Sequence, residues 1–205
     1  MIGLIYADYQ DANFSDTFHR YVCNSFQHVN LKHHSDVLAL TDPSVTIANL
    51  SLLLAKCDFI FYWGHGRSEE TGDFSILGST GQEQIPFSSL SAMLYKKVAY
   101  FDACGLGSKL KQHEIKDCTI ACPIKSVSYD ISVRVGCTTM LGLLGSNLTF
   151  NRAFQQATDL TLTHDLYALC SSGVDIDVNI PVAVKLSLVE CFSNILHMWL
   201  QQKNG

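Results

Sequence analysis

The stretch FIFYWGHG, at residues 59–66, is an apolar and aromatic run that ends abruptly in Gly-His-Gly. A short apolar run bounded by a turn signal predicts a strand that is covered on both faces. Gly64 and Gly66 free the backbone on either side of His65, because glycine accepts conformations and close approaches that other residues do not. We therefore expect the His65 imidazole at the carboxyl end of a buried strand. The alternative is a histidine in a tight turn, hydrogen-bonded to backbone.

Composition predicts one globular domain over residues 1–205. Hydrophobic residues make up 47% of the chain and charged residues 16%, which suits a sizeable core. The formal charge is −5 and no basic run is present, so we expect no nucleic-acid partner. The start, MIGLIYADYQ, has no basic region before its short apolar run, which Asp8 ends. We read it as a first strand, and expect a cytoplasmic protein without a membrane span.

The eight cysteines contain no Cys-x-x-Cys pair. In a protein that is not exported, we expect them to be thiols. Cys118 and Cys122 are four apart, but no neighbouring histidine completes a zinc set, so no metal is expected. Four cysteines in apolar patterns are interpreted as small buried hydrophobes: Cys23, Cys57, Cys170 and Cys191.

Strands alternate with helices along most of the chain. We expect strands at residues 2–6, 37–40, 59–63, 98–101 and 119–124, half of a hairpin at 74–77, and an edge strand or loop at 174–180. We expect helices at residues 12–28, 45–56, 87–95, 137–148, 151–160 and 181–202. The second of these would begin with Asp42 as N-cap and Pro43 in the first turn. The alternation predicts an α/β fold with a parallel or mostly parallel sheet and helices on both faces.

A second motif follows the strand at residues 98–101, in the sequence KKVAYFDACGLGS at residues 96–108. The carboxyl ends of parallel strands share one edge of a sheet, and neighbouring strands lie ~5 Å apart, so Cys104 and His65 could approach each other. A nearby histidine can take the thiol proton or hold the thiolate as an ion pair. The N–H groups of Gly66 and Cys104 are candidate donors to a developing oxyanion. The alternative for Cys104 is a buried thiol at a strand end.

YWGHG at residues 62–66 and YFDACGLGS at residues 100–108 resemble the His and Cys motifs of the caspase-like (clan CD) cysteine peptidases. This clan contains caspases, metacaspases, legumain, gingipains and the bacterial CHAT peptidases. The two motifs most resemble those of the CHAT and metacaspase types. The order His then Cys matches, and the separation of about 40 residues is a little shorter than the ~50 of caspases. TIACPIKSVSYDI at residues 119–131 and FNRAFQQA at residues 150–157 weakly resemble the CHAT tail. The similarity covers about residues 2–160, but only the two motifs are specific.

The resemblance implies a caspase-like three-layer α/β/α sandwich, with His65 as general base and Cys104 as nucleophile. The motif departs from the caspase pattern, because Asp102 stands where caspases have Gln and glycine falls at positions 105 and 107. An acid at position 102 is similar to metacaspases, which implies an S1 pocket for Arg or Lys; the alternative is a cap or turn acid. Asp130 is a second candidate for the pocket wall. Three lysines after the Cys motif are candidate self-cleavage sites: Lys109, Lys111 and Lys116.

Three functions remain open on these residues. The first is a regulated cysteine endopeptidase that cleaves proteins or peptides after Arg or Lys, in bacterial defence or programmed death, without metal or organic cofactor. The second is a catalytically idle caspase-like interaction module, or a subunit that needs an activating sensor or regulatory partner to assemble its site. The third is a flavodoxin-like or receiver-like module, which the absence of glycine in YADYQDANFS, at residues 6–15, disfavours.

Overall fold

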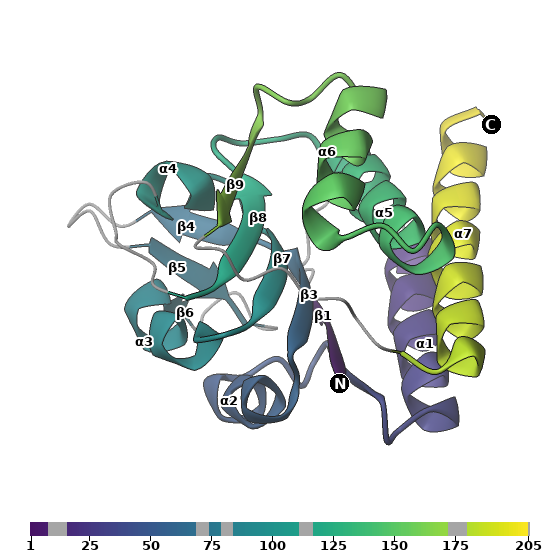
Figure 1. The fold of residues 1–205 in the computed structure, drawn as a ribbon, viewed down its shortest axis with the longest axis horizontal. Coiled ribbons are helices and arrows are strands. Elements are labelled where there is room, and N and C mark those ends of the chain that lie inside the picture. The colour runs from purple at the N-terminus through teal and green to yellow at the C-terminus, as the bar shows by residue number, and fades with distance from the viewer. Residues whose placement is uncertain (8–15, 69–73, 79–83, 111–116, 172–179, 205) are drawn as a thin grey trace.

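A computed structural model describes residues 1–7, 16–68, 74–78, 84–110, 117–171 and 180–204 of the chain. Its centre is a six-stranded sheet with the order β2-β1-β3-β7-β8-β9 (Figure 1). The first five strands in this order run parallel, and β9 is antiparallel at the edge. The strand bounds are β1 Ile2–Ala7, β2 Val37–Thr41, β3 Phe59–Gly64, β7 Val98–Asp102, β8 Thr119–Pro123 and β9 Tyr167–Ser171.

Helices cover both faces of this sheet (Figure 1). One face carries four helices: α1 Asp16–Lys32, α5 Tyr129–Gly145, α6 Phe150–Leu160 and α7 Val182–Asn204. The other face carries α2 Ile47–Lys56, α3 Phe87–Ser91, a 3₁₀ turn Ala92–Leu94 and α4 Leu106–Leu110. A small antiparallel sheet of β4 Gly66–Ser68, β5 Phe74–Leu77 and β6 Gln84–Pro86 lies on this second side. The predicted three-layer α/β/α architecture with a mostly parallel sheet is confirmed.

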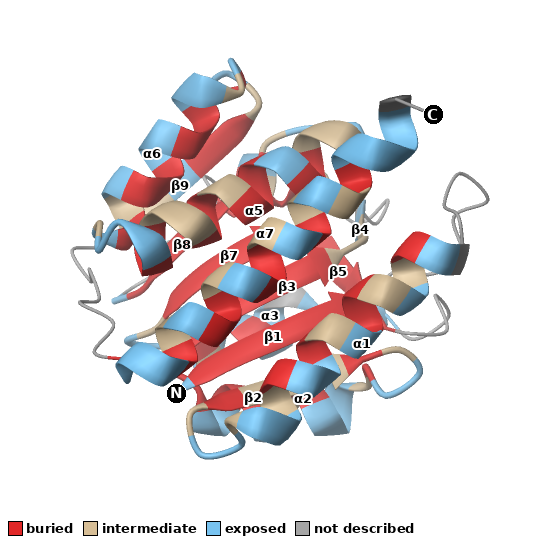
Figure 2. Cartoon of the chain, turned by 90° about the vertical axis from the view of Figure 1, so that its right-hand side faces the viewer, coloured by how far each residue is buried: buried red, intermediate tan, exposed pale blue. Residues whose placement is uncertain are grey.

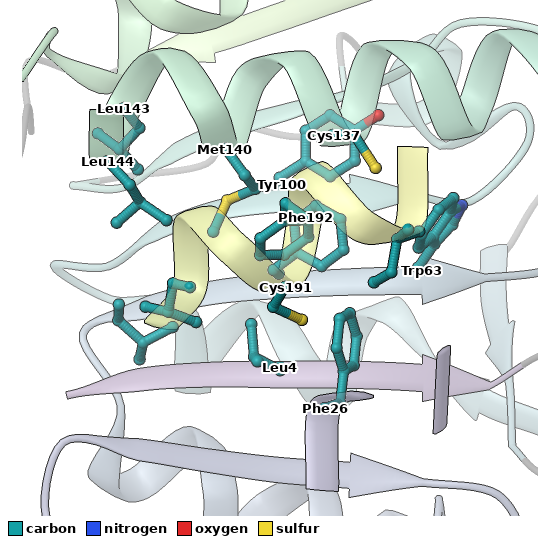
Figure 3. Packing of buried hydrophobic residues seen from close by; sticks show 14 of the residues in the cluster. Leu4, Phe26, Trp63, Tyr100, Cys137, Met140, Leu143, Leu144, Cys191 and Phe192 are labelled. Carbon is teal, nitrogen blue, oxygen red and sulfur yellow. The ribbon is translucent and has the colours of Figure 1, made fainter. Parts of the chain in front are cut away.

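The strand sequences divide their side chains between two cores, because successive residues of a strand point to opposite faces. Phe61 belongs to the core under α1, α5, α6 and α7, where its ring stacks on Tyr100 with 5.1 Å between centroids. Phe192 of α7 packs against Phe61 in the same core, and Figure 3 labels it among its neighbours. Tyr62, the next residue, faces the other core and stacks on Phe101. The central strands are buried on both sides, as Figure 2 shows by colour, which is why they read as continuous apolar runs.

The predicted start of α2 was wrong. The helix begins at Ile47 with Thr46 as N-cap, and the Thr46 Oγ1 accepts a hydrogen bond from the Asn49 N–H at 3.3 Å. Asp42 lies in a turn that Ser44 N–H closes onto the carbonyl of Thr41. Thr46 and not Asp42 is the N-cap of α2, because Thr46 directly precedes the residues whose apolar face packs into the core.

Further elements differ from the prediction, among them α4, β4 and β6, which were not predicted. Helix α5 begins at Tyr129, well before the expected residue 137, and β9 was not predicted. Small residues weaken the apolar helical pattern in the first half of α5. One of them, Gly136, lies directly against the sheet, where an added Cβ would be 3.3 Å from the Phe61 ring. The edge strand or loop predicted at 174–180 lies outside the described residues, apart from its last residue.

All eight cysteines lie in the described residues and none forms a disulfide. The predicted burial of Cys23, Cys57 and Cys191 is confirmed, whereas Cys170 on the edge strand is only partly buried. No helix within the described ranges is long and apolar enough to cross a membrane.

Candidate active site

Strand register brings the two glycine-flanked motifs to one edge of the sheet. Strands β3 and β7 are neighbours, and Trp63 pairs with Asp102. His65 and Cys104 each lie two residues beyond this pair, so they leave adjacent strands at the same level. The backbones of Gly66 and Cys104 lie close together, because a Cβ added to Gly66 would lie 3.1 Å from the Cys104 carbonyl oxygen. Glycine at position 66 is therefore needed for this close approach.

The half-buried His65 is held by its backbone. Its carbonyl oxygen accepts hydrogen bonds from the Leu77 N–H at 3.0 Å and from the Tyr62 hydroxyl at 3.1 Å. Leu77 belongs to β5, which pairs with β4 directly after the histidine. The small sheet thus anchors the loop that presents the imidazole.

Cys104 is half-buried, and its Sγ lies 4.0 Å from the Val127 carbonyl oxygen. Burial raises the pKa of the Cys104 thiol, the Asp102 carboxylate raises it further, and interactions with Val127 and Ser126 partly oppose these effects. A raised pKa favours the neutral thiol over the thiolate. A base that takes its proton during attack fits this state better than a preformed ion pair.

Asp102 lies two residues before Cys104 in the same motif, and its carboxylate is buried, with 3% of the residue exposed. Its Oδ2 accepts hydrogen bonds from the hydroxyls of Ser132 at 2.7 Å, Tyr100 at 2.8 Å and Tyr167 at 3.4 Å. Burial raises the pKa of Asp102 to about 6, while the three donors and the nearby His65 lower it. In the described part of the chain, no Lys or Arg forms a salt bridge with this carboxylate.

Sequence reasoning missed the three donors to Asp102. Tyr100 lies two residues before Asp102 on the same face of β7, so the period of the strand could have identified it. Ser132 and Tyr167 come from α5 and β9, the elements whose start or existence was not predicted. Ser132 also accepts a hydrogen bond from Trp63 Nε1 at 2.7 Å, which links the two motif strands through α5. Trp63 itself is buried, as predicted.

The remaining predicted residues are not among the donors to Asp102, or lie outside the described chain. Asp130, in the first turn of α5, accepts a hydrogen bond from Trp199 Nε1 at 2.9 Å and lies 3.8 Å from Arg134. These contacts give it a role in packing α5 on α7, and its place in a substrate pocket stays a prediction. Lys109 lies in α4, directly after the Cys motif. Lys111 and Lys116 lie outside the described residues.

A groove of about 250 Å³ lies elsewhere, between α1 and α7. None of its lining residues belongs to the edge that carries the two motifs, so the candidate site is identified by its chemistry and not by the depth of a cavity. Within the described residues, no three or more His, Cys, Asp or Glu side chains gather where they could hold a metal ion.

Comparisons with known proteins rest on structure, since no protein-family model and no curated protein sequence matches the chain. The Drosophila initiator caspase Dronc superposes with a TM-score of 0.51 at 10% identity, covering 85% of this chain and 80% of the caspase. The fold is caspase-like. Protein GSU0716 from Geobacter sulfurreducens has a TM-score of 0.45 at 13% identity, covering 83% of this chain and 93% of that protein. Raptor from Chaetomium thermophilum has a TM-score of 0.42 at 8% identity, covering 95% of this chain and 28% of Raptor. Neither of the latter two likenesses carries an argument about the site.

Proposed function

We propose that the protein is a cysteine endopeptidase that uses His65 and Cys104 as a catalytic dyad. The observation that carries this proposal is the register of β3 and β7, which brings both glycine-flanked residues to one edge of a caspase-like sheet. Ligands and catalytic groups gather at the carboxyl ends of strands in such sheets. The close approach of the Gly66 and Cys104 backbones supports a shared site.

The proposed chemistry uses a thiol and an imidazole that leave adjacent strands at the same edge of the sheet. His65 takes the Cys104 proton as Sγ attacks the carbonyl carbon of the peptide bond. The carbonyl oxygen becomes an oxyanion, to which the N–H groups of Gly66 and Cys104 donate. His65 then gives the proton to the leaving amine, and a thioester remains on Cys104. Water, deprotonated by His65, attacks the thioester, releases the carboxylic acid product and restores the thiol.

Asp102 supports a preference for Arg or Lys on the amino side of the cleaved bond. Its buried negative charge is held by three neutral hydroxyls, and no Lys or Arg of the described chain forms a salt bridge with it. A substrate guanidinium or ammonium would supply the missing positive charge, and charge-assisted hydrogen bonds to a carboxylate are strong in a site with little water.

Hydrolysis of fluorogenic peptides tests the proposal. Peptides with Arg, Lys, Asp or Ala before the reporter amide are compared on wild type, Cys104→Ala and His65→Ala. Cys122→Ala is the matched control, because Cys122 is a buried thiol at the end of the next strand, β8. We expect cleavage after Arg and Lys in wild type and Cys122→Ala only. Cleavage that survives Cys104→Ala would overturn the dyad, and a preference for Asp would overturn the role of Asp102.

A chain that cleaves none of these peptides alone, or with candidate partners present, would instead favour the idle interaction module. Cleavage that begins only when a partner is added would support a regulated peptidase. Regulation, self-cleavage and a role in bacterial defence are proposals that depend on this outcome.

A further inference from the structure

The peptide group between His65 and Gly66 is clamped from one side. The Leu77 N–H and the Tyr62 hydroxyl both donate to the His65 carbonyl oxygen, at 3.0 and 3.1 Å. The same hydroxyl also lies 3.2 Å from the Leu77 carbonyl oxygen, so it bridges the histidine loop and β5. Tyr62 is fully buried, and its ring stacks on Phe101 with 5.3 Å between centroids. The hydroxyl therefore has a fixed position.

Clamping this carbonyl also sets the direction of the next N–H. A trans peptide group is planar, and its C=O and N–H point in opposite directions, so holding the His65 oxygen aims the Gly66 N–H the other way. The strand pairing agrees with this direction. Gly66 pairs with Ile76, next to the hydrogen-bonded pair His65 and Leu77, so the Gly66 N–H belongs to a non-hydrogen-bonded pair and points away from β5.

The Gly66 backbone lies against Cys104, as the 3.1 Å from a Gly66 Cβ to the Cys104 carbonyl oxygen indicates. In the proposed mechanism, the N–H that points away from β5 at this position is the donor to a substrate oxygen bound at Cys104. Preorganised donors stabilise an oxyanion because they need no reorientation during the reaction.

We propose that Tyr62 is a positioning residue of the oxyanion hole: its hydroxyl holds the His65 carbonyl and thereby aims the Gly66 N–H. This inference rests on the proposed peptidase function. Tyr62 touches no substrate; it acts through the planar peptide that it clamps. The sequence gives no sign of this role, because Tyr62 reads as one more aromatic residue of a buried strand.

A peptide aldehyde separates this role from a merely structural one. Cys104 Sγ adds to the aldehyde carbon, the thiol proton moves to His65, and the aldehyde oxygen becomes an oxyanion that needs the Gly66 N–H. Iodoacetamide alkylates the same sulfur with loss of iodide and forms no oxyanion. Tyr62→Phe keeps the stacked ring and removes only the hydroxyl. Tyr6→Phe is the matched control, because Tyr6 is also fully buried and its hydroxyl lies 3.0 Å from that of Tyr129.

We expect Tyr62→Phe to lower both kcat and the affinity for an Arg-ending aldehyde about tenfold. A misdirected N–H donor stabilises the oxyanion less than a well-aimed one, but the loss is smaller than when the donor is removed. KM and the iodoacetamide rate should stay within about twofold of wild type, as should all values for Tyr6→Phe. Tyr62→4-aminophenylalanine restores a donor at this position and should recover the aldehyde affinity, which keeps the test decisive if Tyr62→Phe fails to fold.

Unchanged kcat and aldehyde affinity in folded Tyr62→Phe would overturn the inference and leave the peptidase intact. Parallel losses of aldehyde affinity and iodoacetamide rate would also overturn it, since they would mean a general disturbance of the site. A wild type that neither binds the aldehyde nor cleaves peptides would overturn the proposed function, and the inference with it.

Discussion

Replacing Asp102 by Asn should flatten the pH dependence of stability in a way that needs no knowledge of the substrate. Burial raises the pKa of Asp102 from 3.8 to about 6 in the folded protein. Between these two values the folded chain binds more protons than the unfolded chain, so the free energy of unfolding falls as pH rises. Asn keeps the shape of the side chain and cannot ionise. The slope contributed by this carboxyl should therefore disappear in Asp102→Asn.

The magnitude follows from the two pKa values. Stability from this carboxyl is fully present below pH 3.8 and is lost as pH rises through 6. Linkage with these values gives about 1.4 kcal/mol lost between pH 5 and pH 7.5. Asp102 is almost fully buried, so solvent screening does not reduce this figure. Relative to wild type, Asp102→Asn should gain about 1.4 kcal/mol over the same interval.

Urea unfolding followed by tryptophan fluorescence at pH 5, 6 and 7.5 measures these differences. Asp159→Asn is the control, because it removes a carboxylate from an exposed position in α6 and should keep the wild-type slope. Parallel pH profiles for wild type and Asp102→Asn would refute the reasoning, because they would mean that burial does not perturb this carboxyl.

Further predictions concern Gly66, the hydrogen bond from Ser132 of α5 to Asp102, and the three candidate self-cleavage lysines. Gly66→Ala should destabilise the fold by about 1–3 kcal/mol and abolish peptide cleavage, because its Cβ would lie 2.3 Å from the Phe74 ring. Gly145→Ala, with its nearest contact at 3.7 Å, should unfold at the wild-type temperature or above, and equal melting temperatures for both variants would contradict this. Ser132→Ala should lower the free energy of unfolding by about 2–3 kcal/mol at pH 7.5 and raise the pKa of Asp102 further, since a buried carboxylate loses its nearest donor. Urea unfolding that shows no loss of stability would contradict a stabilising hydrogen bond from Ser132 to Asp102. Mass spectrometry of active enzyme after long incubation should find self-cleavage that Cys104→Ala lacks. An intact wild-type chain would contradict self-cleavage. The expected cuts follow Lys109, Lys111 or Lys116.

The sequence predicted the sheet and the motif edge well because both depend on strong local patterns. The apolar runs at residues 59–63 and 98–101 are buried on both faces, and each ends in glycine-flanked residues that mark a strand end. Parallel pairing then follows from the alternation of strands and helices. The shared sheet edge of Cys104 and His65 could be inferred on this basis alone, whereas their direct approach stays a prediction.

What surrounds Asp102 could not be predicted in the same way. Two of its three donors come from α5 and β9, and their approach depends on tertiary packing that no local pattern encodes. Ser132 and Gly136 weaken the apolar period of α5, since small residues there let the helix lie close to the sheet. The start of α2 was missed because Asp42 and Thr46 are both good N-caps, and packing decides between them.

Covalent labelling shows whether Cys104 and His65 act together as a catalytic dyad. An acyloxymethyl ketone peptide ending in Arg is incubated with wild type, Cys104→Ala, His65→Ala and the control Cys122→Ala, and the modified residue is mapped by mass spectrometry. We expect labelling of Cys104 in wild type and Cys122→Ala, none in Cys104→Ala, and a rate at least about a hundredfold lower in His65→Ala. Labelling at another cysteine, or at Cys104 with an undiminished rate in His65→Ala, would contradict the dyad.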